Sequence, residues 1–244
     1  MDMSFRNLIV AALLLSVSAT SLPAQEDGRV FQERAGGNSL LFRGHRAFVY
    51  TQLYNGTYYW LSPAYRTGDV VFGGKVYRDV QLNIDAVRHD LLIRKPDGQA
   101  DLVLDRESVE RFSIGEDNYV NLRFVHGDSA PRGYWQLLYD GRRKFLMQVT
   151  KHMEQDLKGD KRDWTGYDGV YRNDVYQCFV YEKRYCYMDE SGKMVNIRSK
   201  ADLLRQFDRP LRREIRRHMR EFDPTYVLPL DLYGMEILNF LESR

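Results

Sequence analysis

From residue 39 to residue 153, short runs of aromatic and β-branched residues alternate with clusters of turn-forming residues. Aromatic and β-branched side chains pack well on a pleated surface, and turns that recur about every 8 to 12 residues are typical of antiparallel sandwiches and barrels. The pairs Asn55-Gly56 and Gly73-Gly74 supply the positive φ angles that tight hairpins need. This region therefore predicts an antiparallel β-meander, either sandwich-like or a partly closed barrel. The expected strands cover residues 40–42, 47–54, 58–61, 69–72, 75–77, 80–85, 91–94, 100–104, 109–114, 119–124, 133–139 and 144–150.

Two further segments complete the expected organisation. Residues 154–198 begin as a polar connecting segment and then return to strand patterns over 175–188 and 193–197, which predicts a hairpin packed on the meander. In residues 199–244 the period changes to that of a helix, with Ser199 as an N-cap. A helix that starts near Pro210 and ends before Pro224 carries one apolar stripe, formed by Leu211, Ile215, Met219 and Phe222. The predicted fold class is α+β, mainly antiparallel β, with a C-terminal helical tail over 199–244.

The N-terminus has the order of a secretory signal peptide. A polar start is followed by an apolar run, residues 8–19, and by a zone of small residues up to Ala24. The apolar run spans about 18 Å as a helix, too short for a bilayer core of roughly 30 Å. We expect residues 1–24 to be removed, with cleavage after Ser21 or Ala24, and residues 25–38 to form a flexible lead-in. The mature protein is then periplasmic or secreted, with no lipid-attachment cysteine and no transmembrane span, although peripheral membrane contact stays open.

The composition is that of a globular protein and gives no sign of nucleic-acid binding. The chain is 43% hydrophobic and 29% charged with a net charge of +2, as in an ordinary globular protein, so nothing in it indicates a nucleic-acid partner. No nucleotide-binding, metal-binding or nucleophile motif occurs, and the five histidines are scattered. We therefore expect no metal and no cofactor, and assign no catalytic residue.

The two cysteines, Cys178 and Cys186, would meet an oxidising compartment after export. If the chain turns between them, they can face each other and form a disulfide. If residues 178–186 are one continuous strand, eight residues span about 26 Å and the two cannot bond. The sequence leaves both outcomes open.

Aromatic residues gather in YNGTYYWLSPAY, and a tryptophan in GYWQLLY adds to them. The candidate binding residues are Tyr54, Tyr58, Tyr59, Trp60, Tyr65 and Trp135. Because Tyr58 and Tyr59 are adjacent, they should point to opposite faces of a strand, so that at least one ring faces outward. An outward ring offers a flat apolar face and a polar handle for a protein or glycan partner. The alternative is that these rings fill the core of the sheet.

A second candidate surface is a basic helix. Six arginines fall on residues 209–220 and are opposed there by Glu214 alone. They are Arg209, Arg212, Arg213, Arg216, Arg217 and Arg220. They form either an electropositive face for an anionic surface or the solvated side of a docked amphipathic helix.

The order of three motifs also suggests a group of proteins. The stretch from YNGTYYWLSPAY to LNIDAVRHDLLI, then GYWQLLYDG, then NIRSKADLLRQFDRPLRREIRRHMRE resembles secreted β-rich proteins of unknown function from Bacteroidota-type bacteria. The resemblance covers nearly the whole mature chain and implies a Gram-negative envelope location. It implies no activity and no catalytic residue.

Taken together, these patterns lead us to expect an exported, non-enzymatic protein of the cell envelope with a binding or structural role toward an envelope protein or a glycan. Two alternatives stay open. One is a secreted glycan or peptide hydrolase that uses carboxylates the sequence does not identify. The other is a periplasmic carrier of lipid or another small ligand, if the meander closes around a cavity.

Overall fold

The computed structural model describes residues 40–51, 54–98, 100–127, 131–156 and 176–243. The predicted signal peptide, residues 1–24, and the lead-in, residues 25–38, lie outside the described residues. The elements are η2 (Leu40–Phe42), β1 (His45–Arg46), β2 (Arg66–Phe72), β3 (Lys75–Asp85), β4 (Asp90–Arg94), β5 (Asp101–Val103), β6 (Val109–Ile114), β7 (Asp117–Asn121), α3 (Arg123–His126), β8 (Tyr134–Asp140), β9 (Lys144–Asp156), β10 (Tyr176–Met188), β11 (Met194–Ile197), α4 (Lys200–Arg205), α5 (Arg209–Phe222) and α6 (Leu230–Glu242).

All strands of the described chain belong to one antiparallel sheet in the order β1-β5-β4-β3-β2-β6-β7-β8-β9-β10-β11. Most neighbours in the sheet are also consecutive in sequence, which is the expected meander. The α+β prediction, mainly antiparallel β with C-terminal helices, is confirmed. The Gly73-Gly74 hairpin is confirmed as well, because both glycines have positive φ between paired Phe72 and Lys75.

The sheet is curled, and its first and last strands do not pair with each other. One hydrophobic cluster joins Leu91 and Ile93 of β4 to Met147 and Val149 of β9, although these strands lie far apart in the sheet order. A flat sheet could not bring them together. We call the curled part, β1 to β8 with the central part of β9, the roll. Its interior is filled by large side chains, among them Phe112.

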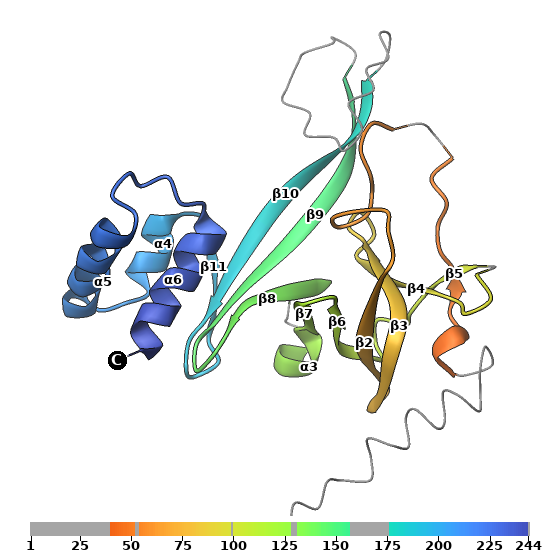
Figure 1. Ribbon diagram of the computed structural model, residues 1–244, viewed down its shortest axis with the longest axis horizontal. Helices are drawn as coiled ribbons and strands as arrows, with labels where there is room; N and C mark the ends of the chain where they lie inside the picture. The colour runs from red at the N-terminus through yellow and green to blue at the C-terminus, as the bar shows by residue number, and fades with distance from the viewer. Residues whose placement is uncertain (1–39, 52–53, 99, 128–130, 157–175, 244) are drawn as a thin grey trace, which may run out of the picture.

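A long hairpin, β9 and β10, leaves the roll and runs diagonally across the molecule (Figure 1). Its strands pair without interruption from Lys144–Met188 to Asp156–Tyr176. The predicted boundary at residue 154 therefore falls inside β9, and the polar segment expected there has residues 157–175 outside the described part of the chain.

The C-terminal helices α4, α5 and α6 pack at one end of this hairpin (Figure 1). Phe145 of β9 and Tyr187 of β10 form a second hydrophobic cluster with Leu203 of α4 and Ile237 of α6. Gly234 of α6 lies directly over the Phe145 ring, where a Cβ atom would come within 2.2 Å of the ring. The small residue allows the helix to approach the sheet closely. In the described part of the chain, no helix is both long enough and apolar enough to cross a bilayer.

Helix α5 begins and ends as the sequence predicts. The Asp208 side chain accepts a hydrogen bond from the Leu211 backbone N–H and so acts as the N-cap, and Pro210 occupies the first turn. Its apolar stripe is docked, because Ile215 and Met219 are buried. Besides this stripe, Arg212 contacts the end of α4 and His218 pairs with Glu236 of α6, so α5 is held along one broad side and its opposite side is turned to solvent. Phe222, the last residue of the predicted stripe, is 52% exposed.

Candidate functional site

Residues 54–60 connect two distant parts of the sheet. Asn55 bridges to Cys178 of β10, with the Phe179 N–H donating to the Asn55 carbonyl oxygen at 3.1 Å. Tyr59 bridges to Asp85 at the end of β3. The sequence predicted regular strands over 47–54 and 58–61 with a tight Asn55-Gly56 hairpin between them, and this prediction is wrong. The backbone of 54–60 divides its hydrogen bonds between two separate strands instead of pairing with itself.

The same region closes the roll. The Lys151 backbone N–H of β9 donates to the Ala86 carbonyl oxygen at 2.9 Å, just beyond the end of β3. Four strands separate β3 from β9 in the sheet order, so this contact joins the two sides of the curl. We call the meeting point of residues 54–60, the end of β3 and β9–β10 the seam.

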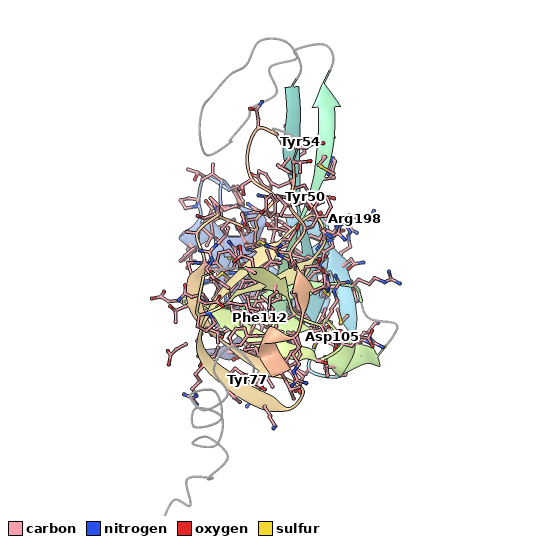
Figure 2. All side chains as sticks on the ribbon, turned by 90° about the vertical axis from the view of Figure 1, so that its right-hand side faces the viewer. Tyr50, Tyr54, Tyr77, Asp105, Phe112 and Arg198 are labelled. Carbon is pink, nitrogen blue, oxygen red and sulfur yellow. The ribbon has the colours of Figure 1, made fainter. Side chains whose placement is uncertain are left out.

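Aromatic rings line the seam in a continuous series, which we call the aromatic band. Its members are Phe48, Tyr50, Tyr54, Tyr58, Tyr59 and Phe179. The Tyr50 ring centroid lies 4.3 Å from that of Tyr58 and 5.5 Å from that of Phe179. Figure 2 shows Tyr50 and Tyr54 beside the β9–β10 hairpin, on the other side of the roll from Tyr77. The band thus combines residues 48–59 with a strand that lies about 120 residues later in the sequence.

Tyr58 and Tyr59 do not point to opposite faces. Their rings stack with centroids 4.2 Å apart, and the Tyr58 hydroxyl donates to the Tyr59 hydroxyl at 2.8 Å. The expectation assumed a regular strand, in which neighbours alternate. Residues 58–60 bend instead, so the two rings lie side by side and form one paired unit of the band.

Exposed apolar side chains continue the band onto the hairpin. Phe48 is 51% exposed, Met153 46% and Tyr181 52%. Met153 stands directly opposite Phe179 in the β9–β10 ladder, and Tyr181 is two residues further along β10 on the same face. Arg88 adds a guanidinium group 4.8 Å from the centre of the Phe48 ring. The resulting surface contains the residue types that protein interfaces favour, namely Tyr, Phe, Met and Arg.

Asp85 lies beneath the band and is almost completely buried. Its carboxylate accepts hydrogen bonds from the Tyr50 hydroxyl at 3.0 Å and from the backbone N–H groups of Val87 and Arg88 at 2.9 and 3.0 Å. Burial raises the pKa of Asp85, and these hydrogen bonds oppose the shift. The carboxylate therefore organises the turn after β3 and orients Tyr50.

Lys151 also holds the backbone of the seam through hydrogen bonds, from the side of strand β9. Its Nζ atom donates to the carbonyl oxygens of Thr57 and Tyr59 at 2.8 and 2.5 Å. Burial lowers the pKa of the Lys151 ammonium group to about 8, and the negative charge of Asp85 partly opposes the shift. Lys151 thus fastens the backbone beneath the Tyr58–Tyr59 pair to strand β9.

The remaining candidate aromatic residues lie in different surroundings. Tyr65 is half-buried, its ring centroid lies 6.2 Å from that of Tyr59, and the Arg94 guanidinium covers it at 4.0 Å. It therefore extends the aromatic series at one end. Trp60 and Trp135 are 5% and 2% exposed and belong to hydrophobic clusters of the sheet. The structure thus brings Tyr54, Tyr58, Tyr59 and Tyr65 together and places the two tryptophans in the core.

The six candidate arginines all lie on α5, but they do not behave alike. Arg212 donates to the carbonyl oxygens of Leu204 and Phe207 at 3.0 and 2.9 Å, so it fastens α5 to the end of α4. The other five, Arg209, Arg213, Arg216, Arg217 and Arg220, are exposed.

Of the two outcomes left open for the cysteines, the structure shows the continuous strand and not the disulfide. Cys178 and Cys186 both lie on β10, which is continuous from Tyr176 to Met188, and both are buried without a disulfide. Eight residues of extended strand separate the two thiols by about 26 Å. Burial raises the pKa of the Cys186 thiol to about 11, which keeps it protonated and unreactive at neutral pH.

A pocket of about 380 Å³ lies away from the seam, between η2, the β2–β3 hairpin and the loop after β5. Leu40, Leu41, Phe72, Tyr77 and Leu104 give it an apolar lining. Among the described residues, no cluster of His, Cys, Asp or Glu side chains could hold a metal ion.

Comparisons of the chain with models of known protein families, with curated proteins and with solved structures give no match in any of the three. The assignment of the candidate site therefore depends on the geometry of the structure alone. The sequence did not indicate Tyr50, Asp85, Lys151 or Phe179 as part of it, because each joins the seam through a contact between distant segments. Alternation along β10 puts Phe179 and Tyr181 on one face, and the strand register adds Met153 to it. Only the ring contacts of Phe179 show that this face meets Tyr50, Tyr54 and Tyr58.

Proposed function

We propose that this protein is an exported, non-enzymatic binding protein of the cell envelope, and that it recognises a protein partner through the aromatic band. The observation that carries this proposal is the continuity of the band with exposed Phe48, Met153 and Tyr181. Large exposed apolar groups that adjoin one another and are rimmed by charge are a mark of interaction surfaces.

The rigidity of the seam supports recognition by a preformed surface. Lys151 holds the backbone under Tyr58 and Tyr59, and Asp85 holds Tyr50. A surface whose rings are already fixed loses little conformational entropy on binding, so more of the contact energy appears as affinity.

The non-enzymatic part of the proposal has its own support. An enzyme presents its reactive groups to a substrate, whereas the hydrogen bonds of Asp85 and Lys151 are directed at the protein's own backbone and at Tyr50. The large side chains packed in the roll likewise favour partner binding over carriage of a ligand inside it.

Site-specific photocrosslinking in the envelope fraction tests the proposal. A benzophenone amino acid at Tyr181 should give a discrete protein adduct, whereas the same group at Val125 of α3, which is 55% exposed, should not. Phe48→Asp should abolish the Tyr181 adduct, and Phe124→Asp, a matched control at 49% exposure, should leave it unchanged. Equal adducts at both positions, or no effect of Phe48→Asp, would overturn the proposal.

Export is tested separately. The protein recovered from the periplasm or the medium should begin at Leu22 or Gln25, as N-terminal sequencing would show. A full-length chain in the cytoplasm would contradict export. The crosslinking experiment tests the binding surface separately from export.

A further inference from the structure

Helix α5 concentrates the positive charge of the protein. Its 14 residues include six arginines and two glutamates, a net formal charge of +4, while the whole chain carries only +2. The rest of the chain is therefore net negative. Arg209, Arg213, Arg216 and Arg220 follow one another at spacings of four, three and four, so they lie on one side of the helix.

This side faces away from the protein. The docked stripe contains Ile215 and Met219, and Arg209, Arg213, Arg216, Arg217 and Arg220 are exposed. In Figure 1, α5 is the outermost element at the helical end of the molecule. A planar anionic surface could therefore approach these arginines without meeting another part of the described chain.

Apolar side chains project at the C-terminal end of the same helix. In the loop that follows it, Tyr226 is 60% exposed and Val227 77%. Phe222 is also exposed, but its spacing of three from Met219 places it on the side of the docked stripe and not on the arginine side. Tyr226 has a φ of 57°, an unfavourable conformation for an aromatic residue. An exposed aromatic side chain in a strained turn is a feature that the packing of the core does not require.

The loop is held in this shape by buried Asp223. Its carboxylate accepts hydrogen bonds from the Val227 and Leu228 backbone N–H groups at 3.2 and 3.0 Å, and Lys200 Nζ donates to the Tyr226 carbonyl oxygen at 3.1 Å. The tip that presents Tyr226 and Val227 is therefore preformed.

We propose that the α5 arginine face and the Tyr226–Val227 tip form a docking surface for an anionic lipid bilayer. Arginines attract acidic head groups, and the side chains of Tyr226 and Val227 enter the interfacial region. Arginines alone would bind any polyanion. The apolar tip at the end of the helix favours lipid, because a soluble polyanion has no apolar region into which the tip could insert. This surface is distinct from the aromatic band and does not depend on the function proposed for it.

Vesicle flotation with the mature protein tests the proposal. The protein should float with phosphatidylcholine vesicles that contain phosphatidylglycerol and not with phosphatidylcholine alone, and the bound fraction should fall as salt is added. At low salt, each arginine should contribute about fivefold to the partition coefficient, so R213Q/R216Q/R217Q should lower it about 100-fold. R43Q/R46Q/R111Q removes three exposed arginines from the roll and should have little effect.

A second variant isolates the apolar tip. Y226S/V227S should lower the partition coefficient by a similar factor in low and in high salt, because the apolar contribution is not screened, whereas the effect of the arginine variant should shrink as salt is added. Circular dichroism of each variant shows whether the helices remain folded. Three results would overturn the proposal: no binding to anionic vesicles at low salt, equal loss in both triple variants, or tighter binding to soluble heparin than to vesicles with no effect of Y226S/V227S.

Discussion

Lys151 Nζ lies 2.8 Å from the carbonyl oxygen of Thr57, a residue 94 positions earlier in the chain. This contact, with its partner at Tyr59, joins an irregular segment to the longest hairpin of the sheet. Loop closure over such a distance costs conformational entropy, so the seam depends on the few polar contacts that hold it.

Removing the Lys151 ammonium group should therefore loosen the seam. Lys151→Met keeps most of the apolar length but leaves two carbonyl oxygens without their donor, and we expect a loss of about 1–3 kcal/mol in the free energy of unfolding. Urea denaturation followed by tyrosine fluorescence measures it. Lys193→Met, at an exposed position, should change stability by less than about 0.5 kcal/mol. Equal effects of the two variants would contradict the role assigned to Lys151.

The same residue should produce a pH dependence. The pKa of Lys151 is lowered to about 8 in the folded state, so between about pH 8 and 10.5 the unfolded state binds more protons than the folded state. The free energy of unfolding therefore gains a positive slope with pH in that window. Tyrosine ionisation acts in the opposite direction above about pH 10, so the test is the difference between wild type and Lys151→Met from pH 7.5 to 10. A difference that does not change with pH would contradict the prediction.

Asp85 should matter through its hydrogen bonds more than through its charge. Burial raises the pKa of Asp85, which means that its ionised form is disfavoured in the folded protein. Asp85→Ala leaves two backbone N–H groups and the Tyr50 hydroxyl without an acceptor and should cost about 2–4 kcal/mol. Asp85→Asn retains an acceptor and should cost less than half as much. Thermal unfolding of both variants compares them, and a larger loss for the Asn variant would refute this explanation.

Gly234 tests the packing of the helices on the sheet. In an exposed helix Gly→Ala is stabilising by about 1 kcal/mol, but here the new methyl group would overlap the buried Phe145 ring. We expect Gly234→Ala to destabilise the protein by about 1–3 kcal/mol. Asn239→Ala, at an exposed site of the same helix, serves as the control and should be neutral or slightly stabilising. A stabilising Gly234→Ala would show that α6 does not approach β9 so closely.

The cysteines should behave as two reduced, protected thiols. Iodoacetamide should modify neither Cys178 nor Cys186 in the native protein and both after denaturation, as intact-mass measurement would show. Reducing agent should leave the unfolding temperature unchanged. Loss of two mass units in the oxidised protein, reversed by reductant, would restore the disulfide hypothesis.

Much of the sheet could be predicted from the sequence because its signals are local. The Gly73-Gly74 turn, the β6 strand at 109–114 and the α5 helix with its apolar stripe all follow from neighbouring residues. One local signal was misleading: Asn55-Gly56 has the composition of a hairpin turn, yet tertiary contacts with Cys178 and Asp85 determine its backbone. Asp79, with a φ of 56°, lies between the two strands expected at 75–77 and 80–85, but β3 continues through it.

Only part of the candidate site could be predicted, because the rest of it depends on contacts between distant segments. Tyr54, Tyr58, Tyr59 and Tyr65 stand close together in sequence, so composition alone indicated them. Lys151 and Phe179 lie at least 86 residues later, in the β9–β10 hairpin, and their inclusion depends on how the sheet curls. No pattern in a single sequence records that curvature.

Strand β10 also sets a distance. Phe179 lies in the aromatic band, and Tyr187 packs against Phe207 at the helical end, with ring centroids 5.7 Å apart. Eight residues of fully paired strand separate the two positions by about 26 Å. The hairpin is therefore a stiff spacer between the two surfaces. A molecule that rests on lipid through α5 would thus keep its partner-binding face at a fixed distance from its helical end, and that distance exceeds the roughly 8–10 Å over which acidic head groups act at physiological salt.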